Sequence, residues 1–394
     1  MSAQNKIHKV LIIGITYTTI AMLGIYITLY QYTILSVSQL FSVDAAMMGL
    51  MIGMQHFGIS IPPLFLGTLS GRIGKKNILM ISILLITIGT FLVGLTNSFG
   101  AFVGSIFIVG AGFSVTEGTM SAVLTDEYPK ETTKHLNFSQ VAFSGGALAG
   151  PLIAEGLIDS GVYFKDLYFY VSAVFLVLGV IFYFTKQQND KGETSVEAAN
   201  FNVIRFLRNK VFLLLALGIF LYVGIENTIA YFSDSYYELI LGKPHLSALA
   251  LSLFWGAMIP SRFLAGIIKV NLKKMFVVLS SLIFAGTIAA MLIPNITVKI
   301  ILFAVCGFGC GPLWPLMMDM VAKKNRGAAG PALNVMMTFT GLGGATLPFI
   351  SGIFVNFSNQ QTAYYICAVA AVLMAIMYVS SLKKTDVSAK SDPT

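Results

Sequence analysis

The stretch that decides the fold runs from Asn77 to Thr96 and reads N-I-L-M-I-S-I-L-L-I-T-I-G-T-F-L-V-G-L-T. It contains no charged residue, and it matches the length of about 20 apolar residues that crosses a hydrocarbon layer about 30 Å thick. Backbone groups in lipid have no water to bond, so an uncharged run of this length has to form a helix. The sequence therefore predicts a membrane-spanning helix here.

Eleven further runs of the same kind lie on either side of this one. They cover 10–34, 44–69, 100–124, 137–159, 166–185, 211–238, 246–269, 274–293, 297–322, 329–356 and 361–382. The chain of 394 residues is 56% hydrophobic and only 11% charged, whereas soluble domains are about 25% charged. We therefore predict an all-α integral membrane protein with twelve transmembrane helices. The polar stretch 186–210 is the expected cytoplasmic linker between a six-helix bundle (1–185) and a second six-helix bundle with a short cytoplasmic tail (211–394).

Basic residues fall unevenly on the two sides of the predicted membrane. Of 25 Lys and Arg residues, Lys165, Lys243 and Lys299 are assigned to loops on one side, Arg262 to the eighth helix or its end, and the remaining 21 to the other side. The side richer in Lys and Arg is normally cytoplasmic, which predicts that both termini lie in the cytoplasm. The net charge of +8 then follows from topology and gives no reason to expect a nucleic-acid partner. The short loops favour a bacterial cytoplasmic membrane.

The two halves of the chain also resemble each other. I-P-P-L-F-L-G from Ile61 and I-P-S-R-F-L-A from Ile259 begin 198 residues apart, and each precedes a pair of lysines. F-S-G-G from Phe143 and F-T-G-L from Phe339 repeat this relation at an offset of 196 residues. Several matches at one offset predict that the halves are parallel repeats of one six-helix unit.

Three motifs carry a resemblance to known transporters. G-T-L-S-G-R-I-G-K-K from Gly67 resembles the major facilitator signature G-x-L-A-D-R-x-G-R-K, with Gly71 in place of its Asp. G-A-G-F-S-V-T-E-G-T-M-S from Gly110 and G-F-G-C-G-P-L-W-P from Gly307 resemble the fucose–galactose–glucose:proton symporter family. The resemblance implies a major facilitator fold and proton-coupled uptake of a sugar or similar small polar solute by alternating access.

Two glutamates inside predicted helices are the main functional candidates, because an ionised side chain at the centre of a bilayer costs at least about 2.5 kcal/mol. The family motif assigns sugar binding and proton coupling to Glu117 in the fourth helix. Glu226 lies in the seventh helix, where Tyr222, one turn away, and Asn227 offer hydrogen-bond partners. The alternative for both glutamates is a packing role, in which a neighbouring helix holds the carboxylate.

Polar and aromatic residues supply further substrate-binding candidates. Asn137 and Gln140 lie three residues apart on the fifth helix and would face either sugar hydroxyls or a neighbouring helix. Trp314 matches an aromatic position of the family and could stack on a sugar ring or pack at a proline-broken helix. Tyr32 stands where the family has the Asn of its first-helix Asn-Asp pair. The missing Asp makes the pocket less polar, and we hypothesise that Glu226 supplies the second carboxylate.

A second group of residues is expected at the cytoplasmic gate. The family signature assigns Arg72, Gly74 and Lys75 to this region, although the absent signature Asp weakens a gate held by that ion pair. Arg262 is predicted near the cytoplasmic end of the eighth helix. Asp319 lies one turn before Lys323 and is expected to pair with it. The charged loop around Glu131 is expected to be a solvated surface.

Other function classes fit the sequence less well. No nucleophile–base set or metal site appears, so neither an enzyme nor a cofactor is predicted, and Cys306 and Cys310 are interpreted as packing residues. The expected partners are a small-molecule substrate, protons and the lipid bilayer, and the chain is expected to be a monomer. Proton-driven efflux of an amphipathic or drug-like compound remains the alternative, since the same carboxylates could drive export. A sensor without flux would be expected to carry a longer soluble tail.

Overall fold

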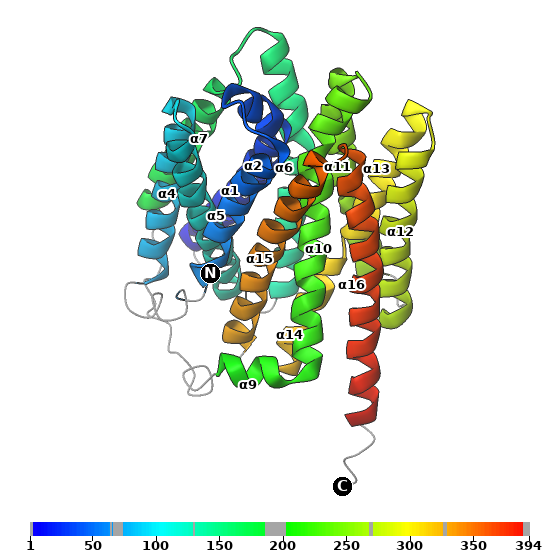
Figure 1. The fold of residues 1–394 in the computed structure, drawn as a ribbon. Helices are drawn as coiled ribbons and strands as arrows, with labels where there is room; N and C mark the ends of the chain where they lie inside the picture. The colour runs from blue at the N-terminus through cyan, green and yellow to red at the C-terminus, as the bar shows by residue number, and fades with distance from the viewer. Residues whose placement is uncertain are drawn as a thin grey trace. The chain divides into compact units, whose positions relative to one another are not determined.

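A computed structural model describes residues 3–63, 65, 74–128, 131–185, 202–267, 271–325 and 329–388 of the chain (Figure 1). The regular elements in these ranges are all helices, and 11 of them are long and apolar enough to cross a membrane. The remaining predicted span, 44–69, contains helix α2 (Ala45–Ser60). The predicted helical membrane architecture is therefore confirmed.

The chain divides into two compact units, Met1–Val43 with Met54–Glu193 and Asp44–Gly53 with Thr194–Thr394. The helices up to residue 193 are α1 (Ala3–Leu40), α2 (Ala45–Ser60), α4 (Lys75–Leu95), α5 (Phe99–Glu127), α6 (Thr132–Asp159) and α7 (Asp166–Phe184). The first turns of α2 thus group with the second unit and the rest of α2 with the first.

Beyond residue 201, the structure describes a short helix of the second unit and then the remaining spans. Its helices are α9 (Val203–Arg208), α10 (Lys210–Ser235), the π-helix η1 (Tyr236–Ile240), the 3-10 helix η2 (Pro244–Leu246), α11 (Ser247–Ile267), α12 (Leu272–Leu292), α13 (Ile296–Cys310), α14 (Leu313–Lys324), α15 (Ala329–Asn356) and α16 (Gln361–Ser388). The predicted run 297–322 corresponds to α13 and α14 together. Residues around Gly311 and Pro312 interrupt it.

Several helices continue beyond the apolar runs that predicted them. Helix α1 has 38 residues and ends at Leu40, where the run ends at 34. At 1.5 Å per residue this helix is about 57 Å long, which exceeds the 40–45 Å of a bilayer with its headgroups. A helix does not have to stop where the hydrocarbon stops, so hydropathy alone underestimates its length.

Close contacts at glycines repeat between the two units. A Cβ at Gly146 of α6 would collide with the backbone of Ala21 in α1, and a Cβ at Gly343 of α15 would collide with the backbone of Phe220 in α10. Gly343 follows Gly146 by 197 residues, and Phe220 follows Ala21 by 199 residues. The same relation holds for Gly110–Gln55 and Gly307–Phe254. The internal repeat seen in the sequence is therefore also present in the helix packing.

Two lysines assigned to outside loops are buried. Lys299 lies in the first turn of α13, within the predicted run 297–322, and is only 3% exposed. Its Nζ donates to the Ala290 carbonyl in the last turn of α12 (2.5 Å) and to the Tyr236 hydroxyl (3.0 Å). Lys165 lies between α6 and α7 as expected, but its Nζ donates to the Thr96 carbonyl that follows α4 (2.6 Å). Each ammonium thus satisfies a carbonyl left without a donor at a helix end.

Candidate functional site

The most deeply buried acidic candidate is Glu226 of α10, which is 9% exposed. One turn earlier, the Tyr222 hydroxyl donates a hydrogen bond to Glu226 Oε1 at 2.6 Å. Residues four apart on a helix face each other, so this bond follows from the sequence spacing and confirms the predicted partner. Asn227, the other predicted partner, donates to the Val223 carbonyl at 2.9 Å instead.

The interruption between α13 and α14 follows from two prolines. Proline has no N–H, so Pro312 and Pro315 leave the carbonyls four residues earlier, those of Phe308 and Gly311, without their helical donors. Two adjacent side chains of α11 supply donors instead. The Ser261 hydroxyl donates to the Phe308 carbonyl at 2.5 Å, and Arg262 Nε donates to the Gly311 carbonyl at 2.9 Å. We call these four residues the α11 clamp: Ser261, Arg262, Phe308 and Gly311.

Arg262 and the buried acid of α10 share two neighbouring residues. Both the Arg262 guanidinium and the Glu226 carboxylate act electrostatically on Tyr222 and on Cys310, which are fully buried. An arginine predicted near the end of the eighth helix is thus directed toward the interior of the second unit. A carboxylate, a phenol and a guanidinium are gathered where α10, α11 and α13 pack.

Trp314, the aromatic candidate, is the second residue of α14. It is half-buried, and its position at the start of α14 is set by the same proline interruption. A polar substrate ring could stack on an indole held in this way.

In the first unit the candidates lie on three helices. Glu117 of α5, Gln140 of α6 and Tyr32 of α1 are each half-buried. Beside Tyr32, Thr33 is buried and shares a hydrogen bond of 2.7 Å with the Tyr168 hydroxyl of α7. Asn137 belongs to α6, but its side chain lies outside the part of the structure that is described.

The candidates for the gate fall partly within the described ranges. Arg72 lies outside them. Gly74 precedes α4 with a φ of 83°, a left-handed conformation that favours glycine, and the following Lys75 is half-buried. Lys76 donates to the carbonyls of Tyr183 and Thr185 at the end of α7, each at 2.7 Å. The two described signature lysines thus begin α4, and one of them closes the end of α7.

The ion pair expected on α14 is present. Lys323 Nζ lies 2.6 Å from Asp319 Oδ2, and both side chains are exposed. An exposed pair of this kind contributes at most about 1 kcal/mol to stability, so the pair does not fix the helix by itself. The expected interaction is confirmed, and its part in gating stays a prediction.

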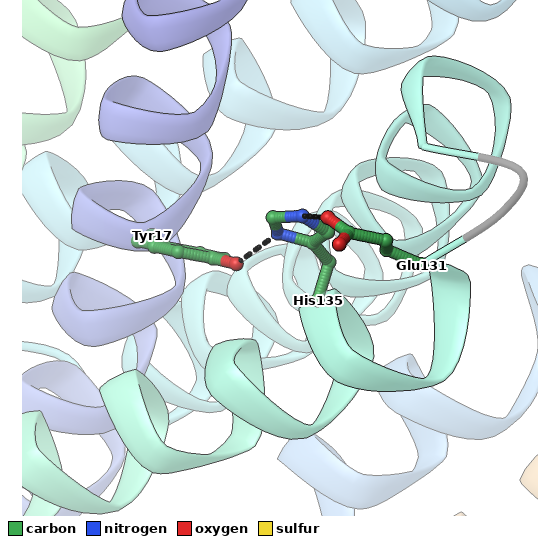
Figure 2. A network of polar contacts seen from close by, with 3 residues as sticks. All are labelled: Tyr17, Glu131 and His135. Atoms are coloured by element: carbon green, nitrogen blue, oxygen red, sulfur yellow. Dashed lines mark hydrogen bonds and ion pairs between the residues drawn. The ribbon is translucent and has the colours of Figure 1, made fainter.

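One polar cluster has no counterpart in the sequence analysis. In Figure 2 the Tyr17 hydroxyl of α1 points at the ring of His135, on α6, and Glu131 approaches the ring's other nitrogen. Tyr17 and His135 are 118 residues apart, so no local pattern could have joined them. The α11 clamp could have been anticipated, because the two prolines identify the carbonyls that need donors.

Helices that carry buried polar and ionisable side chains within long apolar spans define the class of this protein. Such residues are costly in a bilayer and mark a route for a polar solute or ion. The chain belongs to the Major Facilitator Superfamily, whose sequence profile matches residues 11–330 and 242–393. The fold is that of a twelve-helix membrane transporter.

Similar proteins agree with this family. A protein of Helicobacter pylori that bears the name putative glucose/galactose transporter is 26% identical over 306 residues, covering 72% of this chain and 73% of that protein. The cis,cis-muconate transport protein of Acinetobacter baylyi is 26% identical over 379 residues, covering 89% and 90%. The crystal structure of the E. coli fucose:proton symporter matches with a TM-score of 0.69 at 18% identity, covering 94% and 98%.

Proposed function

We propose that this protein takes up a sugar or a similar small polar solute together with protons, by alternating access. The observation that carries the proposal is the buried Tyr222–Glu226 pair in the second unit, with Glu117 half-buried in the first. Each unit of the repeat thus contains an acid within a membrane span, and such acids serve as proton carriers in transporters. The names of the glucose/galactose and fucose relatives support a sugar as the solute.

In this proposal Glu117 is the main protonation site, and Glu226 is the second carboxylate. Desolvation disfavours the charged form of a carboxylate, so an acid in these surroundings binds a proton when the aqueous site closes. Gln140, Asn137 and Tyr32 hydrogen-bond the solute, and Trp314 stacks on its apolar face. The termini lie in the cytoplasm of a bacterial cell, and the protein acts as a monomer.

The gate in this proposal uses the signature residues and the α11 clamp. Gly74 and Lys75 lie where α4 begins, and Arg72 belongs to the same signature. Arg262 contributes through its bond to the Gly311 carbonyl (2.9 Å), and Asp319 contributes through its pair with Lys323. No step depends on an Asp at position 71.

Buried amides favour a polar solute over an amphipathic one. Gln31 and Gln55 are fully buried in the first unit, and Asn227 is buried in the second. Amide groups offer both donors and acceptors to hydroxyls. A drug exporter would instead be expected to gather aromatic residues around its substrate. Uptake of a polar solute is therefore preferred to efflux.

The test uses proteoliposomes and radiolabelled glucose, galactose, fucose and cis,cis-muconate, with and without an inward proton gradient. Wild type should accumulate at least one sugar only with the gradient, and Glu117→Gln should abolish this accumulation. Asp159→Asn, which changes an exposed acid at the end of α6, is the matched control and should behave as wild type. Accumulation of muconate alone would replace the sugar with a dicarboxylate, and accumulation of no solute would refute uptake.

A further inference from the structure

A cluster of four polar residues lies just outside the predicted span of α6. His135 Nδ1 is 2.7 Å from the Tyr17 hydroxyl, and His135 Nε2 is 3.6 Å from Glu131 Oε2 (Figure 2). The ring of Tyr128, the residue after α5, lies 4.1 Å from the His135 ring between centroids. Residues from α1, α5 and the start of α6 therefore meet at one imidazole.

Close packing of α1 and α6 holds this cluster together. The two helices run parallel, since Gly146 contacts Ala21 and Gly150 contacts Thr28 further along both helices. Tyr17 and His135 lie at the beginning of the same contact. The close approach of the α1 and α6 backbones at Gly146 and Gly150 therefore brings Tyr17 and His135 within hydrogen-bond distance.

The cluster leads from buried to exposed groups. His135 is 8% exposed, whereas the Glu131 side chain is 54% exposed. Three titratable groups lie against the ring: Tyr17 from α1, Tyr128 just after α5 and Glu131 just before α6. Burial, followed by the carboxylates of Glu127 and Glu131, raises the pKa of Tyr128, so this phenol stays neutral beside the ring.

The chemistry of Tyr17, His135 and Glu131 suits proton exchange. An imidazole accepts a proton at one nitrogen while it releases one from the other, and a hydroxyl can donate or accept. Either neutral form of His135 can therefore keep its bond to Tyr17. The carboxylate of Glu131 faces Nε2 and is open to water, so it can take a proton from the ring and pass it to solvent.

Helix α5 connects this cluster to the proposed protonation site. Glu117 precedes Tyr128 by 11 residues, or about three turns and 16 Å along the helix. Ser121 lies one turn after Glu117 on the same face. Tyr128, whose ring packs on His135, therefore follows α5 on the side of the helix that carries Glu117.

We propose that His135 is the relay through which the transported proton leaves the first unit, with Tyr17 on its inner side and Glu131 on its outer side. This inference rests on the proposed proton coupling. The Tyr17 hydroxyl gives its proton to His135 Nδ1 and takes up the proton that Glu117 releases, so the ring becomes imidazolium. The ring then loses its Nε2 proton to Glu131, and Glu131 releases it to water. Each step breaks one O–H or N–H bond and forms another, so the cluster returns to its starting charge with the ring proton on Nδ1, and this proton has to return to Nε2 before the next transfer.

The test separates proton release from solute movement. His135→Gln keeps a side chain that can accept from Tyr17 and donate to Glu131, but an amide cannot carry the proton. In proteoliposomes, gradient-driven accumulation of the transported sugar should fall on the order of 100-fold, as on loss of an acid–base group. Exchange of labelled for unlabelled sugar should stay within about twofold, since the proton remains bound during exchange. Imidazole trapped inside the vesicles should restore part of the accumulation.

His245→Gln changes an exposed histidine of the second unit and should match wild type in both assays. A purely structural role for His135 predicts that the Gln variant is active, or that it loses exchange and accumulation together without rescue by imidazole. Either result would overturn the relay while leaving the proposed symport intact. If wild type shows no gradient-driven accumulation of any solute, both the symport and the relay are wrong.

Discussion

The contact between α1 and α6 gives the most direct test of the packing. Gly145 and Gly146 are neighbours in α6, yet a Cβ at Gly145 would meet no atom within 4 Å, whereas one at Gly146 would lie 2.8 Å from the Ala21 carbonyl carbon. Non-bonded carbons prefer about 3.5 Å or more, so α1 and α6 would have to separate by at least about 0.7 Å. The substitutions Gly145→Ala and Gly146→Ala therefore differ in one contact only.

The size of the effect follows from two opposing contributions. Both substitutions gain up to about 1 kcal/mol from the higher helix propensity of alanine. Only Gly146→Ala forces atoms together, and overpacking costs typically about 1–3 kcal/mol. The free energy of unfolding of Gly146→Ala should therefore be about 1–3 kcal/mol below that of Gly145→Ala, which should equal or exceed wild type.

The assay is unfolding of the purified variants in mixed micelles by increasing sodium dodecyl sulfate, followed by far-UV circular dichroism. Gly145→Ala serves as the control, because it makes the same chemical change one residue away. If both variants unfold at the same detergent fraction, the close approach of α1 and α6 does not depend on Gly146. The glycine would then have to be explained by something other than this contact.

Two further predictions concern buried polar groups. Tyr222→Phe removes the hydrogen bond to Glu226 and should lower the free energy of unfolding by about 2 kcal/mol. Tyr378→Phe should be neutral or stabilising, because the Tyr378 hydroxyl has no hydrogen-bond partner within the described ranges. Equal losses in the two variants would contradict this. Lys165→Met should cost about 2 kcal/mol, since the Thr96 carbonyl loses its donor. Burial lowers the pKa of Lys165 below 10.5, although the neighbouring Asp166 carboxylate opposes this shift. Between the lowered pKa and 10.5 the unfolded chain binds more protons than the folded chain, so the free energy of unfolding of wild type should rise with pH in this range. Denaturant titrations of Lys165→Met across the same range should show no such rise.

The fold could be predicted because the lipid solvent leaves few alternatives. Uncharged runs of about 20 residues have to be helical in hydrocarbon, and the offset between Ile61 and Ile259 identified the repeat that the contacts of Gly146 and Gly343 reproduce. The burial of Lys299 could not be predicted from the sequence. Its acceptors belong to α12 and to Tyr236, and their proximity is decided by tertiary packing.

The candidate site could be predicted only where the partners are close in sequence. Tyr222 and Glu226 are one turn apart, so helical geometry was sufficient to pair them. Asp319 and Lys323 follow the same rule. The contact between Tyr17 and His135 depends instead on how α1 packs against α6. Glu131 was therefore interpreted as part of a solvated loop, although it also faces a buried imidazole.

The α11 clamp has a consequence for how this sequence can change over evolutionary time. Pro312 and Pro315 create two carbonyls that need donors, and Ser261 and Arg262 supply them. Loss of either donor while the prolines remain would strand a backbone acceptor in an apolar interior, at about 1–3 kcal/mol each. If other residues replaced Pro312 and Pro315, their backbone N–H groups could donate to these carbonyls, and positions 261 and 262 would be free to vary. Positions 261, 262, 312 and 315 should therefore be inherited as a set, and they should covary across relatives more strongly than their separation in sequence suggests.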